Sequence, residues 1–100
     1  MKLRVLGEAE AELLDAMRYY EERQSGLGLD LHDRVAETLG NVSEAPDRFP
    51  VYEGKRLRRQ YRRAVVKRFP YIVVYRVRKG EILVVAVAHT SREPGYWEDH

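Results

Sequence analysis

Positive charge is concentrated just after the middle of the chain. A run of cations with one tyrosine among them occupies residues 56–68, namely Arg56, Arg58, Arg59, Tyr61, Arg62, Arg63, Lys67 and Arg68. Guanidinium groups bind phosphate oxygens through paired hydrogen bonds, so this composition is typical of a phosphate-binding surface. An acidic protein segment would satisfy the same groups. A third interpretation is an exposed edge strand that positive charge protects against pairing with other sheets.

We predict that this run is extended from Lys55 onward. Alternation along a strand would place its arginines on opposite faces, Arg58 with Arg62 and Arg59 with Arg63. Neither face would be apolar, so the run cannot be a central strand of a sheet. It is therefore expected to be exposed, or half-covered by a partner.

His89 is the histidine best placed for chemistry, because it follows a predicted strand and precedes Arg92 and Tyr96. Such a group could perform acid–base catalysis on a phosphodiester. The simpler interpretation is a histidine that is hydrogen-bonded at the edge of a sheet. His32 lies on a polar helix face and His100 at the terminus. Because the three histidines are far apart and lack carboxylate motifs, we predict no metal site and no cofactor.

Two apolar runs predict the framework that positions these residues. Tyr71–Val77 and Ile82–Ala88 are rich in Val, Ile and Tyr, which is typical of buried strands. Lys79-Gly80 between them predicts a two-residue hairpin loop. A short strand is predicted at Lys2–Leu6, and Val65-Val66 is predicted to re-enter the core after the basic run.

Two amphipathic helices are predicted at Glu8–Gln24 and Leu29–Glu44. Their apolar stripes recur at helical spacing, with Leu13, Met17 and Tyr20 in the first and Leu31, Val35, Leu39 and Val42 in the second. The connection between them is short, so the helices must pack antiparallel. We therefore predict one α+β domain over residues 1–100, with the order β-α-α-β-β-β. The helical hairpin packs on one face of a small, mostly antiparallel sheet.

Composition bounds the functional classes. Hydrophobic residues make up 44% of the chain and charged residues 34%, which predicts a folded, water-soluble domain. The absence of cysteine excludes a disulfide framework and fits a reducing cytoplasm. No apolar run reaches the roughly 20 residues of a membrane helix. Residues 1–50 carry 6 Lys/Arg and 11 Asp/Glu, whereas residues 51–100 carry 12 and 5. This asymmetry predicts one face for a negatively charged partner. The alternative is that acidic side chains only solvate the helical half and basic side chains the sheet half.

Five segments together form a recognisable pattern. They are Ala9-Glu10-x-Glu12-Leu13, Tyr19-Tyr20-Glu21, Gly26-Leu27-Gly28, Arg68-Phe69-Pro70-Tyr71-x-x-x-Tyr75-Arg76-Val77 and Val87-Ala88-His89-x-x-Arg92-x-Pro94-Gly95-Tyr96-Trp97. This pattern resembles the RelE/ParE toxins of bacterial type II toxin–antitoxin systems, over nearly the whole chain. The resemblance implies a helical hairpin on an antiparallel-rich sheet, a cytoplasmic setting and no membrane partner. It also implies a small cognate antitoxin that binds the toxin in a hetero-oligomer.

The resemblance leaves the cellular target open between two branches. Members that cleave messenger RNA on the ribosome carry a Tyr-Arg-x-x-Tyr pattern in the middle strand. At the matching positions this chain has Tyr71-Ile72-Val73-Val74-Tyr75. Ile72 thus replaces the arginine that acts on the scissile phosphate. These nucleases also tend to have a basic residue near the position of Thr90. The Phe69-Pro70-Tyr71 junction looks more like the branch that poisons DNA gyrase. We therefore expect a non-enzymatic toxin of the ParE type, with growth inhibition and plasmid stabilisation as its effects.

Candidate site residues follow from these alternatives. For binding gyrase or the antitoxin, we expect a charged surface formed by Arg58, Arg59, Arg62 and Arg63. We also expect a contact through the C-terminal tail, formed by Arg92, Tyr96 and Trp97. For a ribosome-dependent endoribonuclease, the candidates are Arg62, Arg63, His89, Arg92 and Tyr96. A third alternative is an inactivated toxin kept as a binding module. Tyr96 and Trp97 could instead fold back onto the sheet.

Overall fold

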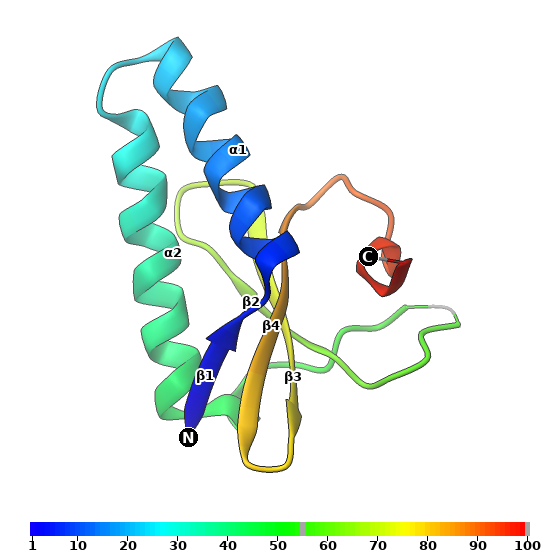
Figure 1. Cartoon of the computed structure of the whole chain (residues 1–100). Helices are drawn as coiled ribbons and strands as arrows, with labels where there is room; N and C mark the ends of the chain where they lie inside the picture. The colour runs from blue at the N-terminus through cyan, green and yellow to red at the C-terminus, as the bar shows by residue number, and fades with distance from the viewer. Residues whose placement is uncertain (55, 100) are drawn as a thin grey trace.

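The computed structural model describes residues 1–54 and 56–99. The elements follow the predicted order, as Figure 1 shows. They are β1 (Lys2–Val5), α1 (Gly7–Arg23), α2 (Leu27–Glu44), the 3-10 helix η1 (Pro46–Arg48), β2 (Arg62–Val65), β3 (Tyr71–Arg78), β4 (Glu81–His89) and the 3-10 helix η2 (Tyr96–Asp99). None of the helices in these residues is long and apolar enough to cross a membrane.

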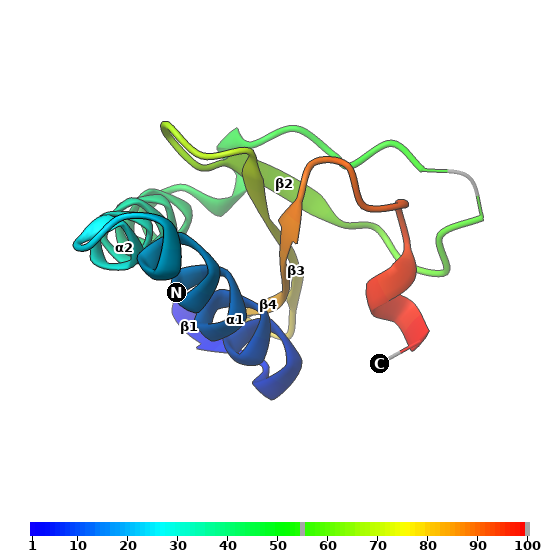
Figure 2. The ribbon, with the colours of Figure 1, turned by 90° about the horizontal axis from the view of Figure 1, so that it is seen from above.

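The four strands form one mixed sheet in the order β1-β4-β3-β2. β1 pairs with β4 in parallel, and the other two pairings are antiparallel. Both helices lie on one side of the sheet, whereas the chain end with η2 lies on the other side (Figure 2). The predicted helical hairpin on a mostly antiparallel sheet is therefore confirmed.

The two central strands are buried on both faces over residues 72–75 of β3 and 82–88 of β4. One face packs against the helices through Val73, Tyr75, Val84 and Val87. The other face packs against the tail, which is residues 90–99, through Ile72, Val74, Ala86, Ala88 and the indole of Trp97. Because both faces are covered, β3 and β4 have almost continuous apolar sequences instead of alternating ones.

The turn between β3 and β4 has the predicted two-residue form. Lys79 and Gly80 both have positive φ angles, 49° and 74°, and Arg78 pairs with Glu81 across the turn. Positive φ at both central positions is the geometry of a type I′ turn, whose twist matches that of the strands it joins.

A β-bulge interrupts the pairing of β3 with β4. Val74 pairs with Ala86 and Tyr75 with Val84, so Val85 is an extra residue on β4. Val85 and Ala86 consequently both face the tail side of the sheet, where both belong to the core around Trp97.

The prediction of an extended run from Lys55 is wrong for residues 56–61, and Lys55 itself lies outside the described residues. β2 begins only at Arg62. Residues 56–61 form turns and bends, because Leu57 and Tyr61 anchor this segment to the core around Trp97 instead of to a neighbouring strand. The predicted alternation of Arg58 with Arg62 and of Arg59 with Arg63 is therefore lost.

β2 forms the edge of the sheet, as its sequence predicted. Its outer side is partly covered, because the Arg63 N–H donates to the Pro50 carbonyl at 3.1 Å and Val51 forms a bridge with Arg62. Val66 is buried, but the prediction for Val65 is wrong, since its side chain is 70% exposed. Strand alternation directs it away from the core.

The helices approach each other closely near their connection. The Glu21 carboxylate accepts hydrogen bonds from the Gly26 and Gly28 N–H groups, at 2.9 and 3.0 Å, and so caps the start of α2. α2 therefore begins at Leu27, two residues before the prediction. A methyl group on Gly28 would lie 2.6 Å from the Met17 carbonyl oxygen, so only glycine fits this contact.

Substitution at Gly28 should destabilise the hairpin. We expect Gly28→Ala to lower the free energy of unfolding by about 1–3 kcal/mol, because the clash forces the helix backbones apart. Gly40→Ala in the same helix is the matched control, since a methyl group there meets no atom within 4 Å. It should raise stability by roughly 0.5–1 kcal/mol through helix propensity. Urea unfolding measures both, and equal effects would contradict the proposed close approach.

Candidate functional site

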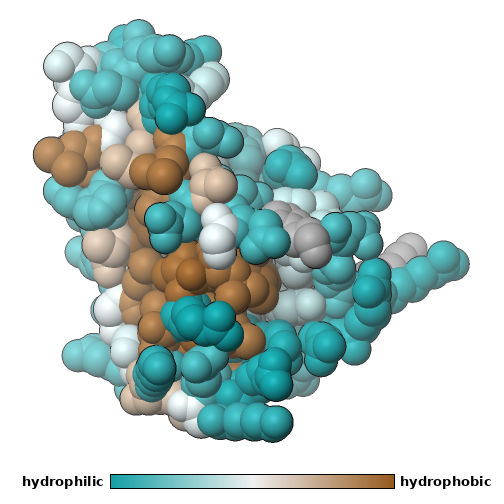
Figure 3. All heavy atoms as spheres, viewed as in Figure 1, coloured by the Kyte–Doolittle hydropathy of each residue, from teal (hydrophilic) through white to brown (hydrophobic). Residues whose placement is uncertain are grey.

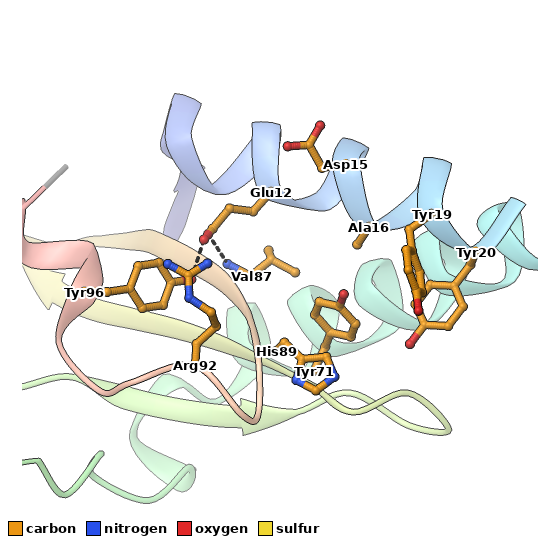
Figure 4. A pocket seen from close by; sticks show the side chains of 10 residues that line it. All are labelled: Glu12, Asp15, Ala16, Tyr19, Tyr20, Tyr71, Val87, His89, Arg92 and Tyr96. Carbon is orange, nitrogen blue, oxygen red and sulfur yellow. Dashed lines mark hydrogen bonds between the residues drawn. The ribbon is translucent and has the colours of Figure 1, made fainter. Parts of the chain in front are cut away.

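A cavity of about 380 Å³ opens between α1, the end of β4 and the tail. Figure 4 shows its lining side chains, which come from three parts of the fold. They are Glu12, Asp15, Ala16, Tyr19 and Tyr20 of α1, Tyr71 and Val87 and His89 of the sheet, and Arg92 and Tyr96 of the tail. Three of the predicted site residues therefore share one cavity: His89, Arg92 and Tyr96.

The Glu12 carboxylate connects the three walls of this cavity. β1 is short and pairs with β4 only as far as Val84, so the rest of β4 lacks a strand on that side. There the Val87 N–H donates to Glu12 Oε1 at 3.0 Å, and the Tyr96 hydroxyl donates to Glu12 Oε2 (Figure 4). One side chain of α1 thus replaces a missing strand and holds the tail.

Tyr96 is held in its neutral form. Burial raises the pKa of its hydroxyl above the ordinary value, and the hydrogen bond to Glu12 adds to this effect. The Arg92 guanidinium lies over the Tyr96 ring, 3.8 Å from its centroid. The pair presents a positive charge on an aromatic face.

His89 is fixed by its own loop. Its Nδ1 accepts a hydrogen bond from the Ser91 N–H at 3.0 Å and lies 2.8 Å from the Ser91 hydroxyl. A backbone N–H can only donate, so the neutral ring has its proton on Nε2. The ring packs edge-on against Tyr71 with centroids 5.3 Å apart. This is the geometry of the simpler interpretation, a hydrogen-bonded histidine at the sheet edge.

The tail folds back onto the sheet. The indole of Trp97 is only 5% exposed, and the rings of Tyr52, Tyr61 and Tyr96 surround it edge-on at centroid distances of 5.2–5.4 Å. The alternative that the tail aromatics pack within the chain is confirmed for Trp97. Its indole offers little surface to a partner.

Arg58 belongs to this tail packing. Its backbone N–H donates to Glu98 at 2.9 Å, and its guanidinium pairs with Asp99 at 3.2 Å. The Tyr61 hydroxyl also donates to Glu98, at 3.0 Å. The residues before β2 are thus tied to η2, and the charge of Arg58 is partly neutralised within the chain.

The other predicted cations point in different directions. The Arg62 guanidinium donates to the backbone carbonyls of Asp47 and Phe49, which fixes it beside η1. Arg63 is exposed and lies 5.9 Å from the centroid of the Tyr52 ring. The structure therefore does not bring the nuclease candidates together, because neither of these arginines lines the cavity that contains His89, Arg92 and Tyr96.

Two important residues escaped the sequence analysis as site candidates. Glu12 looked like one of several solvent-facing acids at the start of a helix. Its partner, the Val87 N–H, is available only because β1 ends before it reaches that part of β4. Arg76 is the first charged residue after the apolar run that begins β3, and that contrast could have marked it. It lies beside Arg59 and Arg62 in a second cavity. No group of three or more acidic or histidine side chains in residues 1–54 and 56–99 is placed to hold a metal ion.

Comparison with known proteins gives the family. The profile of the family described as "ParE toxin of type II toxin-antitoxin system, parDE" matches residues 3–94. The chain belongs to the ParE toxin family. Among solved structures, this ParE-family chain is similar to one described as "Chromosomal ParDE TA system from P. aeruginosa". The TM-score is 0.74 at 18% identity, and the alignment covers 89% of this chain and 95% of that one. No curated protein sequence matches.

Removing Glu12 should destabilise this ParE-family fold. Glu12→Ala leaves the Val87 N–H and the Tyr96 hydroxyl without their acceptor, which should cost about 1–3 kcal/mol of unfolding free energy. Glu22→Ala removes an exposed acid from the same helix and should change stability by less than about 0.5 kcal/mol. Chemical denaturation measures both variants. Similar values would show that the carboxylate contributes nothing beyond its charge.

Alkaline pH should destabilise this ParE-family toxin through Tyr96. Its pKa is raised in the folded state, so the unfolded chain releases the hydroxyl proton first and gains stability as pH rises above about 10. The free energy of unfolding should fall through that range, and Tyr96→Phe should flatten the fall. Between pH 6 and pH 8 the two curves should run parallel. Denaturation across this pH series is the measurement, and equal alkaline slopes would contradict the assignment.

Proposed function

We propose that this ParE-family chain is a non-enzymatic toxin that poisons DNA gyrase in the bacterial cytoplasm and that a cognate antitoxin neutralises it. The observation that carries the proposal is the match to the ParE toxin family over residues 3–94. The solved structure with the same fold is described as a ParDE toxin–antitoxin system, which supports a partner of the same kind here.

Two features of the structure favour a binding toxin over a nuclease. Ile72, which replaces the arginine of the ribosomal nucleases, is only 5% exposed and lies in the apolar core with Trp97. A cation at that position would have to enter this apolar cluster, and burying an unpaired charge costs several kcal/mol. The remaining candidates for phosphate chemistry are divided between the cavity beside α1 and β2.

The helix side of the molecule suits the antitoxin. Figure 3 shows apolar side chains gathered over the region where β1, α1 and β4 meet, with hydrophilic groups around them. Leu14 and Leu29 of the helices are 50% and 61% exposed. Exposed leucines on two packed helices are suited to covering by apolar residues of a protein partner.

Purified gyrase tests the proposed target. We expect the toxin alone to inhibit supercoiling of relaxed plasmid and to trap the cleaved complex, and we expect prior mixing with the antitoxin to abolish both effects. Unchanged supercoiling without trapped cleavage would reject gyrase as the target. Cleavage of messenger RNA on programmed ribosomes would then favour the nuclease alternative.

Exposed arginines provide a sharper version of this experiment. Arg59→Gln with Arg63→Gln removes two exposed cations, and we expect about tenfold more toxin to be needed for half-inhibition. The matched control, Lys2→Gln with Arg18→Gln, removes the same charge from the other half of the chain and should act like the unaltered toxin. Equal loss in both double variants would indicate a general effect of net charge.

A further inference from the structure

A second cavity, of about 260 Å³, is separate from the one beside α1. Its lining consists of Asp47, Arg59, Gln60, Arg62, Arg76 and Val77, and it shares no residue with the first cavity. Three guanidinium groups thus meet at one hollow where the end of β3 lies beside β2 and η1.

These cations have few counter-charges. In residues 1–54 and 56–99, no carboxylate forms an ion pair with Arg59, Arg76 or Arg78. The half-buried Arg76 has a lowered pKa, first because of burial and then because Arg59 and Arg78 repel its charge. Asp47 is the one acid among the lining residues. An anion at this position would relieve the repulsion among these cations.

The guanidinium group of Arg62 is fixed at this site. It is bound to the carbonyls of Asp47 and Phe49 through Nη1, which orients the planar group before any ligand arrives. Arg76 and Arg78 lie two residues apart on β3, so their Cα atoms are about 6.8 Å apart along one face. Arg62 lies opposite Tyr75 on the edge strand and not in this row, so it reaches the cavity from the side of η1. The site therefore offers a cluster of charges with one member positioned in advance.

The chemistry of the lining favours a phosphate backbone over an acidic protein segment. Protein partners bind through apolar and aromatic anchors, and the cavity beside α1 has four tyrosines in its lining. The second cavity has no aromatic residue among its lining residues, and Val77 is the one apolar residue there. Contacts with nucleic acid are more polar and more positively charged, and many of them go to phosphate oxygens.

We propose that Arg59, Arg76 and Arg78, together with the fixed Arg62, bind backbone phosphates of DNA. The contact is independent of base sequence and supplements binding to the protein target. This inference deepens the proposed function, because it places the toxin on the DNA that gyrase holds. It gives the positive half of the chain a ligand that differs from the antitoxin.

Binding of a short labelled DNA duplex by the antitoxin-free toxin, followed by anisotropy over a series of salt concentrations, tests the proposal without gyrase. Four neutralised phosphates, one for each arginine, predict a slope of log affinity against log salt near −3.6. Arg76→Gln should reduce the magnitude of that slope by about 1 and weaken binding roughly tenfold at low salt. Arg76→Lys should retain part of the affinity, because it keeps the charge but loses the planar fork.

Control variants distinguish the loss of a cation at this cavity from a general change in net charge. Arg18→Gln removes an exposed cation of α1 and should leave DNA binding unchanged. Asp47→Asn removes the one acid that lines the cavity and should strengthen DNA binding. Thermal unfolding verifies that each variant is folded. If Arg76→Gln fails this check, Arg59→Gln in the exposed segment before β2 replaces it.

Several outcomes would overturn the proposal. These are no duplex binding at low salt, equal losses in Arg76→Gln and Arg18→Gln, or a Glu-rich peptide that binds more tightly than DNA and loses that binding in Arg76→Gln. The last result would assign the cavity to a protein partner. Gyrase poisoning by a toxin that does not bind DNA would reject this inference and keep the proposed function. DNA binding without any effect on gyrase would keep this inference and reject the proposed function.

Discussion

The two central strands are apolar on both faces, and the rest of the structure follows from the need to cover both. A sheet of four strands cannot leave either face of β3 and β4 in water without exposing Val, Ile and Ala side chains. The helical hairpin covers one face. Trp97 and the segment before β2 cover the other. The tail is thus part of the core, and the residues that bind it to the sheet and to α1 stabilise the fold.

This division also separates the two candidate surfaces. On the helix side, Glu12 joins α1, β4 and Tyr96 around a cavity rich in tyrosine. At the end of β3, Arg76 and its neighbours form a hollow that is almost entirely polar. The lining of the first includes four tyrosines and that of the second three arginines, and they share no residue. The two proposed partners would therefore not compete for the same side chains.

Sequence patterns predicted the elements better than the site. Period and composition located both helices, and the Lys79-Gly80 turn followed from glycine's freedom at positive φ. The basic run was predicted as a strand because alternation was the only available guide, whereas Tyr61 and the tail carboxylates decide its path. Such contacts join residues about 40 positions apart, and no local pattern contains them. The family resemblance rested on motifs of the core and tail, which the fold retains.

The β-bulge at Val85 gives the fold a tolerance in chain length. Val85 is an unpaired extra residue, and Val84 and Val87 on either side of it face the helices. A chain that lacks this one residue would keep each flanking side chain on its present face and would merely lose the bend. Relatives of the ParE family can therefore differ by one position here while sharing the same core, and insertions or deletions in sequence alignments are expected at this point of β4.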